Sequence, residues 1–239
     1  MCVLTLAWDI HPDWLLIAAG NRDEAHARPS APLARWSDGS GLIGGRDLLS
    51  GGMWLGVSEH HPRFAVVTNV TGQGPPDPDR LSRGGLVRNA LASRTPFAAA
   101  QPSRYNPFNL IVVADGEARE STNRPEALDR PLARGWHALS NGLLGAPWDR
   151  KERLTLAAQA WLETAPTGPE GLFGPLDDRV EGRPAELARP IFLLNDLYGT
   201  RCSTVVAVDR AGRGRIWERR FDATGALTGE TEIAFHWLI

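Results

Sequence analysis

The sequence predicts an α+β protein, in which mainly antiparallel sheets are covered by helices. About ten segments have strand length and are rich in apolar and β-branched residues, whereas two segments show a clear helical spacing. Short turns containing Gly, Pro, Asn or Asp separate neighbouring strand-like segments, which favours hairpins. The first two strand-like segments are almost continuously apolar, and this pattern is typical of a sheet covered on both faces.

The strand predictions follow the chain in order. Residues 3–8 and 14–19 pair as a first hairpin around the turn at His11-Pro12-Asp13, because proline disfavours a regular strand or helix there. A tight turn at Asp115-Gly116 predicts another hairpin. The predicted strands are residues 3–8, 14–19, 53–58, 63–70, 108–114, 117–122, 135–140, 202–209, 214–222 and 230–238.

The remaining segments are expected as loops or helices. Residues 25–52 and 72–80 contain many Pro and Gly residues and are predicted as loops. A helix is predicted from Ser82, with an apolar stripe at helical spacing. A second helix is expected to start with a capping box formed by Asp149 and Glu152. Residues 165–190 are rich in Pro and Gly and are predicted to hold short helical turns at most.

Composition limits the class of protein. The 239 residues show no break in composition, so we expect one domain over residues 1–239. A net charge of −2 gives no argument for nucleic acid as a partner, and no apolar run approaches the roughly 18–20 residues of a membrane span. The N-terminus has no secretory signal pattern. Two cysteines provide neither a disulfide framework nor zinc spacing, so we expect a cytoplasmic protein. The expected partner is a small-molecule ligand or substrate.

Cys2 is the first candidate for chemistry. If Met1 is removed, Cys2 carries a free α-amine with a reference pKa of about 7.7–8.0. That amine can act as the general base for the adjacent thiol, as in N-terminal threonine nucleophiles. Cysteine is small enough that removal of Met1 is expected. The alternative interpretation is that Cys2 is an inert, small, buried residue.

Polar groups recur where the predicted strands end. They are Asn21-Arg22-Asp23-Glu24, Thr68-Asn69, Leu139-Ser140-Asn141, and Gly199 to Thr204. Such positions are where a site can be assembled from several strands. Taken singly, an Asn at a strand end is also typical of a turn, and an Arg beside an Asp is also typical of an ordinary ion pair.

A series of motifs runs in one order over nearly the whole chain. The motifs are Met1-Cys2, Asn21-Arg22-Asp23-Glu24 with Arg28-Pro29, Gly45-Arg46-Asp47, Gly51-Gly52-Met53-Trp54-Leu55-Gly56-Val57, Thr68-Asn69, Ser82-Arg83-Gly84, Phe108-Asn109-Leu110, Leu139-Ser140-Asn141 with Pro147-Trp148, and Tyr198-Gly199-Thr200-Arg201. Together they resemble the NRDE family, which is the family of the transport and Golgi organisation protein 2. The departures are Met53 where threonine is more usual, and Cys202 where serine is.

This resemblance implies a fold. The NRDE family is regarded as having the N-terminal-nucleophile hydrolase fold, a four-layer αββα sandwich of two mainly antiparallel sheets. A looser similarity connects the chain to N-terminal-cysteine acylases of the bile-salt hydrolase and penicillin V acylase type. In those enzymes the Arg and Asp that follow the second strand are separated, whereas Arg22 and Asp23 are adjacent. Asn21 or Glu24 therefore fills one of these roles in an alternative assignment.

The resemblance also implies an activity. It predicts an amidohydrolase that cleaves a linear C–N bond through a thioester on Cys2, with no resident cofactor or metal. In this prediction Arg22 and Arg201 lower the thiol pKa, and Asp23 orients the N-terminal ammonium. Asn69 and Asn141 donate N–H groups to the oxyanion. The predicted catalytic residues are Cys2, Arg22, Asp23, Asn69, Asn141 and Arg201, and the predicted substrate-binding residues are Asn21, Glu24, Arg46, Asp47 and Trp54.

A binding protein without turnover is the competing hypothesis. Members of the NRDE family are implicated in intracellular haem trafficking, so the same pocket is a candidate site for haem or an acyl ligand. Against haem, no Cys-Pro dipeptide or isolated His stands out as an axial ligand. Trp54 either lines an apolar pocket or packs in the core. His60-His61 lacks neighbours at metal spacing and reads as a solvated turn.

Overall fold

The structure is a computed structural model that describes residues 2–93, 95–96, 101–164, 168–179 and 190–239. The chain forms two compact units, and it enters each unit more than once. Unit 1 contains Met1–Ala27, Arg134–Ser140 and Pro147–Ala234, and unit 2 contains Arg28–Ala133, Asn141–Ala146 and Phe235–Ile239. The single domain expected over residues 1–239 stays a prediction.

The described residues form strands, short 3₁₀ segments and helices in the following order. The elements are β1 (Val3–Trp8), β2 (Trp14–Ala25), β3 (Ser30–Arg35), β4 (Leu42–Asp47), β5 (Leu55–Ser58), β6 (Arg63–Asn69), α1 (Gly84–Ala92), η1 (Pro102–Arg104), β7 (Phe108–Ala114), β8 (Glu117–Thr122), β9 (Leu128–Pro131), β10 (Gly135–Leu139), α2 (Asp149–Glu163), η2 (Pro169–Leu172), α3 (Phe173–Leu176), β11 (Tyr198–Asp209), β12 (Arg213–Phe221) and β13 (Leu227–His236). All ten predicted strands are present.

Unit 1 is built on sheet A, whose strands run in the order β10-β1-β2-β11-β12-β13. The pairings of β1 with β10 and β2, and of β11 with β2 and β12, are antiparallel. Every residue of β1 is buried, as its continuous apolar sequence predicts. β2 and β11 pair along most of their length and lie at the centre of the sheet.

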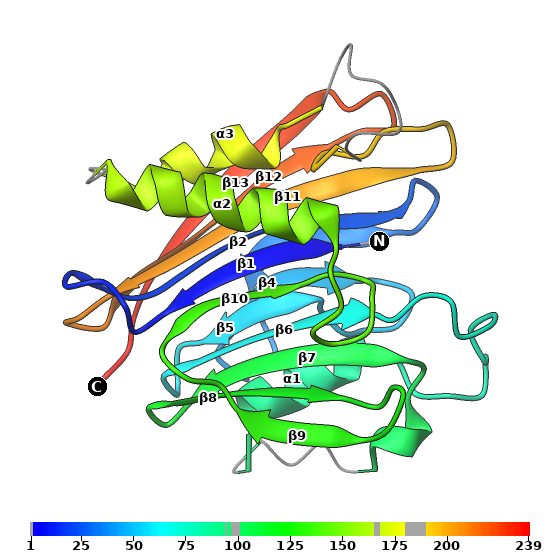
Figure 1. Ribbon diagram of the computed structural model, residues 1–239, viewed down its shortest axis with the longest axis horizontal. Coiled ribbons are helices and arrows are strands. Elements are labelled where there is room, and N and C mark those ends of the chain that lie inside the picture. The colour runs from blue at the N-terminus through cyan, green and yellow to red at the C-terminus, as the bar shows by residue number, and fades with distance from the viewer. Residues whose placement is uncertain (1, 94, 97–100, 165–167, 180–189) are drawn as a thin grey trace. The chain divides into compact units, whose positions relative to one another are not determined.

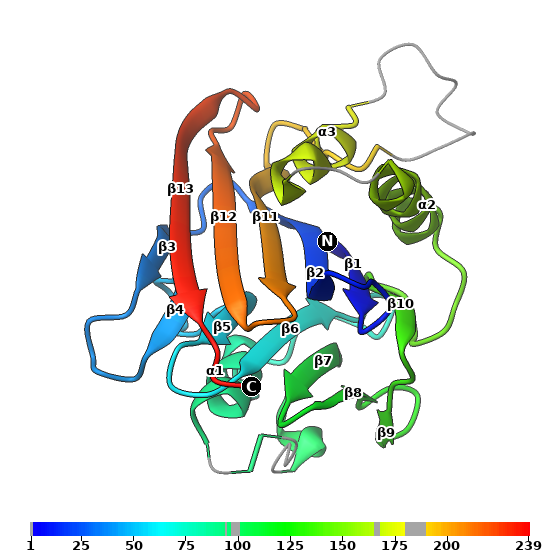
Figure 2. The same cartoon turned by 90° about the vertical axis from the view of Figure 1, so that its left-hand side faces the viewer.

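Helices α2 and α3 cover one face of sheet A (Figure 2). Side chains alternate between the two faces of a strand, so Val3, Ile17 and Ala19 all point to this helix-covered face. There they pack against Leu154 of α2 and Leu176 of α3 in one buried cluster. The residues that alternate with these along β1 and β2 point to the opposite face of the sheet.

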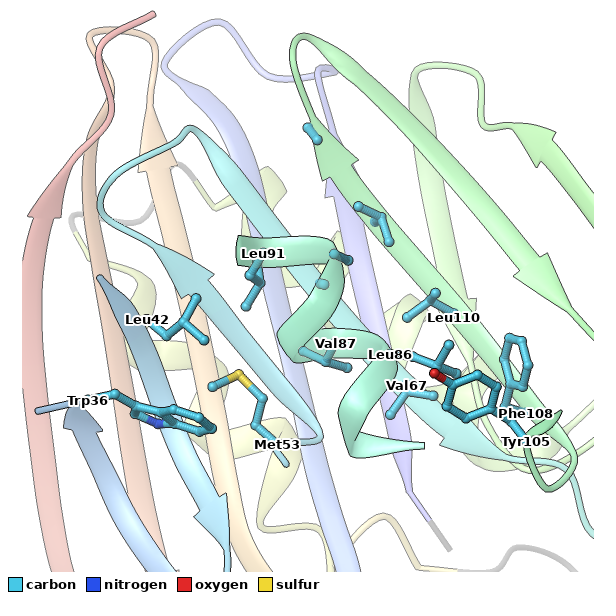
Figure 3. Close-up of a cluster of buried hydrophobic side chains, with 14 residues drawn as sticks. Trp36, Leu42, Met53, Val67, Leu86, Val87, Leu91, Tyr105, Phe108 and Leu110 are labelled. Atoms are coloured by element: carbon cyan, nitrogen blue, oxygen red, sulfur yellow. The ribbon is translucent and has the colours of Figure 1, made fainter. Parts of the chain in front are cut away.

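Unit 2 is built on sheet B, in the order β3-β4-β5-β6-β7-β8-β9, with antiparallel pairings throughout. Helix α1 packs on this sheet through Leu86, Val87 and Leu91, which is the apolar stripe expected from the sequence. Figure 3 shows these side chains meeting Met53 and Val67 in the unit's core. The mainly antiparallel α+β architecture is therefore confirmed.

Two segments differ from the sequence predictions. Residues 25–52 are not a single loop, because β3 and β4 form a hairpin inside them despite the prolines. Proline is tolerated in β3 because this is an edge strand. Strand β9 was missed, since its four residues are all exposed and carry no apolar pattern.

The start of the second helix also differs from the expectation. Trp148 occupies the N-cap position, and Asp149 is the first helical residue rather than the cap. Glu152 supplies half of the predicted capping box, because it accepts a 3.1 Å hydrogen bond from the Trp148 N–H. Within 165–190, η2 and α3 are the predicted short turns, and residues 165–167 and 180–189 lie outside the described part.

Among the helices of the described ranges, none has both the length and the apolar character needed to cross a membrane.

Candidate active site around Cys2

Cys2 directly precedes β1 and is held there by its main chain. The Ser140 hydroxyl, at the end of β10, donates a 2.9 Å hydrogen bond to the Cys2 carbonyl oxygen. On the other side of β1, Val3 pairs with Asn21 of β2. The Cys2 thiol faces the carbonyl oxygen of Asp23, with 4.0 Å between the sulfur and that oxygen. The two neighbouring strands thus fix the position of the predicted nucleophile.

The polar cluster Asn21-Arg22-Asp23-Glu24 forms the last part of β2, whereas the sequence predicted that this strand ends at residue 19. β2 continues to Ala25 because β11 pairs with it over this stretch. The four side chains therefore alternate between the two faces of sheet A. Asn21 and Asp23 point to the helix-covered face. Arg22 and Glu24 point to the opposite face, where their side chains form an ion pair of 3.5 Å.

The Asn21 side chain is fully buried and makes three hydrogen bonds within unit 1. Its Nδ2 donates to the carbonyl oxygens of Leu176 at 2.9 Å and Ile191 at 3.1 Å. Its Oδ1 accepts a 2.7 Å bond from the Ser203 hydroxyl of β11. These contacts use its amide to join sheet A to the α3 region, and its predicted role in substrate binding stays a prediction.

Asp23 is the most highly connected residue of the motif. One carboxylate oxygen accepts a 2.7 Å bond from Arg150 of α2, and the other accepts a 2.7 Å bond from the Thr200 hydroxyl. Burial raises the pKa of the Asp23 carboxyl, and the neighbouring Arg150 guanidinium opposes that rise. The Tyr198 hydroxyl donates a 2.6 Å bond to the Asp23 carbonyl oxygen.

The face opposite the helices carries a row formed by Cys2, Arg22 and Cys202. Arg22 pairs with Cys202 across β2 and β11, and Cys2 occupies the corresponding position beside Arg22. Burial raises the pKa of the Cys2 thiol, and the Arg22 charge acts in the opposite direction. Burial also raises the pKa of Cys202 well above 9.0, with Glu218 adding to the rise. Both thiols are therefore neutral near pH 7.

Arg201 lies at a β-bulge in β11. The register shifts by one residue between Thr200 and Cys202, so Thr200 stands opposite Asp23 where an unbroken ladder would place Arg201. A hydroxyl therefore faces the Asp23 carboxylate. The Arg201 guanidinium instead donates to the carbonyl oxygens of Ala25 at 3.2 Å and His26 at 2.5 Å. Its predicted effect on the Cys2 pKa stays a prediction.

Asn69 and Asn141 come together in unit 2. The Asn141 Nδ2 donates a 2.9 Å hydrogen bond to the carbonyl oxygen of Asn69, at the end of β6. The Asn141 carbonyl oxygen accepts bonds from the Thr71 main chain and hydroxyl, and Asn109 holds the carbonyl of Gly142 at 2.9 Å. One of the two Asn141 N–H donors is used in this way. The oxyanion role of both asparagines stays a prediction.

The other predicted substrate-binding residues of unit 2 have structural contacts. Arg46 lies over the Trp36 ring, 4.5 Å from its centroid. Asp47 pairs with Arg28 at 2.6 Å and accepts bonds from the Leu49 and Ser50 N–H groups. Trp54 is buried. The predicted role of Arg46, Asp47 and Trp54 in substrate binding stays a prediction.

From the sequence, no role was assigned to several residues that the structure places around Cys2, Asn21 and Asp23. They are Ser140, Arg150, Tyr198, Thr200 and Ser203. Thr200 and Tyr198 lie inside a quoted motif, yet only Arg201 was given a role there. Arg150 had a usable signal, because a cation in the first turn of a helix opposes the helix dipole and calls for a specific partner. In the described part of the chain, no three or more His, Cys, Asp or Glu side chains are grouped to hold a metal ion.

The fold has a counterpart among solved structures. The structure is similar to that of a Caenorhabditis elegans N-acylethanolamine-hydrolyzing acid amidase ortholog, with a TM-score of 0.52 and 14% identity. The similarity covers 85% of this chain and 92% of that one. The chain thus has the N-terminal-nucleophile hydrolase fold, which confirms the fold that the resemblance implied.

The family follows from the sequence comparisons. The family model described as Transport and Golgi organisation 2 matches residues 1–223. The Bos taurus Transport and Golgi organization protein 2 homolog is 31% identical, over 97% of each chain. The Homo sapiens homolog is 28% identical, over 92% of each chain. The chain belongs to the Transport and Golgi organisation 2 family.

Proposed function

We propose that the chain is an N-terminal-cysteine amidohydrolase that cleaves a linear amide bond through a thioester on Cys2. The observation that carries the proposal is the position of Cys2, which is fixed at the head of a central strand beside Arg22 and the Asp23 carbonyl. The fold it shares with a solved acid amidase supports the reaction class. The activity requires that Met1 is removed, so that Cys2 carries the free amine.

The raised pKa of Cys2 determines how its thiol must be activated. A resting thiolate is disfavoured by burial, so the proton leaves as the thiol attacks. The α-amine of Cys2 takes this proton as general base, and the sulfur forms a bond to the amide carbon. Collapse of the tetrahedral intermediate breaks the C–N bond, and the ammonium returns the proton to the leaving amine. Water then attacks the thioester, which releases the acid and regenerates the thiol. Arg22 is the nearby cation that counters the cost of negative charge on sulfur.

Mass spectrometry tests the proposal directly. Intact mass shows whether Met1 is lost, and incubation with N-acyl amides of varied chain length reveals an acyl adduct on Cys2. The adduct and turnover should disappear in Cys2→Ala and persist in the matched variant Cys202→Ala. Turnover that survives in Cys2→Ala, or quantitative retention of Met1, would overturn the mechanism.

Binding without turnover is the second candidate function. The raised pKa of the Cys2 thiol favours it, because a neutral buried thiol is suited to lining an apolar ligand site. An acyl ligand fits this chemistry. Haem ligation by Cys2 fits poorly, since a metal-bound cysteine must be deprotonated. A haem titration followed at the Soret band, with Cys2→Ala as control, measures this alternative. A Cys2-dependent Soret shift without any acyl adduct would favour the carrier function.

A further inference from the structure

Arg150 occupies an unfavourable position that needs an explanation. It lies in the first turn of α2, where the helix dipole disfavours a positive charge, and only 2% of its surface is exposed. Its Nη2 donates 2.7 Å hydrogen bonds to Asp23 and to the carbonyl oxygen of Ile191. Its Nε and Nη1 are buried and find no hydrogen-bond partner within the described residues. The Asp23 carboxylate is therefore the group that pairs with this buried guanidinium.

Asp23 transmits this contact through the sheet. Its carboxylate lies on the helix-covered face, between Arg150 and Thr200. Its carbonyl oxygen accepts the Tyr198 bond and faces the Cys2 sulfur at 4.0 Å. The Arg150 guanidinium thus contacts the side chain of Asp23, and the Cys2 thiol faces its main-chain carbonyl oxygen. Hydrogen bonds hold both the side chain and the main chain of Asp23. Removing one charge of a buried ion pair leaves the other uncompensated, which strongly destabilises the structure around it.

We infer that Arg150 is a positioning residue, which fixes Asp23 from the helix layer and so sets the position of the Cys2 thiol on the other face of sheet A. The inference rests on the proposed function in taking Cys2 as the reactive group. It is measured through the accessibility of the thiol, which needs no turnover. Arg150 itself touches no reacting atom.

The primary experiment is the rate of alkylation of each cysteine by iodoacetamide, followed by peptide mass mapping. In Arg150→Met we expect Cys2 to react at least about fivefold faster, because the segment that holds it opens locally, while the Cys202 rate stays constant. Arg150→Lys keeps the charge and should return the Cys2 rate toward that of the parent. Arg153→Met, one turn further along α2, removes the Arg153–Asp178 ion pair and should leave both rates unchanged.

The pattern of the two rates separates positioning from general destabilisation. Equal increases at Cys2 and Cys202, or no increase at either, would overturn the inference. If Arg150→Met does not fold, the double variant Arg150→Met with Asp23→Asn removes both charges of the pair and leaves no buried charge unpaired. It still removes the hydrogen bond that fixes residue 23 from α2, so the Cys2 rate should rise while the Cys202 rate stays constant. Where turnover is detected, Arg150→Met should lower kcat with little change in KM. If the parent shows no turnover, the amidohydrolase proposal fails, while the alkylation rates still decide the role of Arg150.

Discussion

The Tyr198 hydroxyl donates a 2.6 Å hydrogen bond to the carbonyl oxygen of Asp23, the same atom that the Cys2 thiol faces. This bond joins the first residue of β11 to the most connected residue of β2. A tyrosine from one strand and a cysteine from beside another therefore converge on one main-chain oxygen.

Tyr198→Phe removes that hydrogen bond and keeps the ring. Because the bond is neutral and partly buried, its loss should lower the free energy of unfolding by about 1 kcal/mol. Urea denaturation followed by tryptophan fluorescence measures the change. An unchanged midpoint and slope would show that the bond adds nothing to stability.

Asn21→Ala should destabilise the protein more strongly than Ser203→Ala. The first change leaves the carbonyls of Leu176 and Ile191 and the Ser203 hydroxyl without this partner, whereas the second removes one bond. We expect losses of about 3 and about 1 kcal/mol, respectively. Thermal unfolding of the two variants provides the comparison. Equal losses would contradict the structural role assigned to Asn21.

Stability should fall as the pH rises above about 9. The folded state raises the pKa of both thiols, so the unfolded chain releases these protons first, and alkaline pH favours unfolding. The contribution of each thiol is fully present below its ordinary pKa and is lost at up to about 1.4 kcal/mol per pH unit above it. Cys202→Ala should reduce this slope between pH 9 and pH 10. Identical slopes in the parent and the variant would refute the shift at Cys202.

Two adjacent glycines of α1 should respond oppositely to alanine. A Cβ on Gly84 would lie 3.0 Å from the Met53 nitrogen and 3.1 Å from the Gly52 Cα, so Gly84→Ala should destabilise. A Cβ on Gly85 meets nothing within 4 Å, and Gly85→Ala should stabilise by about 0.5–1 kcal/mol. Differential scanning calorimetry of both variants checks the signs. Destabilisation by both would show that Gly85 is also tightly packed.

The buried strands were predictable because their sequences are continuously apolar. Residues 3–8 and 108–114 match β1 and β7 at both ends. Strands β3 and β9 were not predictable from the sequence, because edge strands bury few side chains and can therefore carry proline and charged residues. For the same reason β2 was predicted too short. Its last residues are polar, and only the contacts with β11 and α2 explain why they remain in a strand.

The site divides in a similar way. Cys2 and the motif from Asn21 to Glu24 were found from their positions in the sequence, and the structure places them together on neighbouring strands. The orientation of the four side chains was not predictable, because the predicted strand ended at residue 19 and the division between two faces requires that the strand continues through the motif. Arg150 was missed because its partner lies 127 residues away. Its position in the first turn of a helix indicates that a partner is needed, but it does not identify that partner.

The alternation along β2 also bears on inherited and engineered sequence changes. Asn21 and Asp23 are held by buried contacts on the helix side, so changing them should reduce the amount of folded protein in a cell. Arg22 lies on the thiol side, and its charge acts on Cys2 and Cys202. We therefore expect substitutions of Asn21 or Asp23 to lower the amount of folded protein, whereas substitutions of Arg22 should change the reactivity of the thiols in protein that still folds.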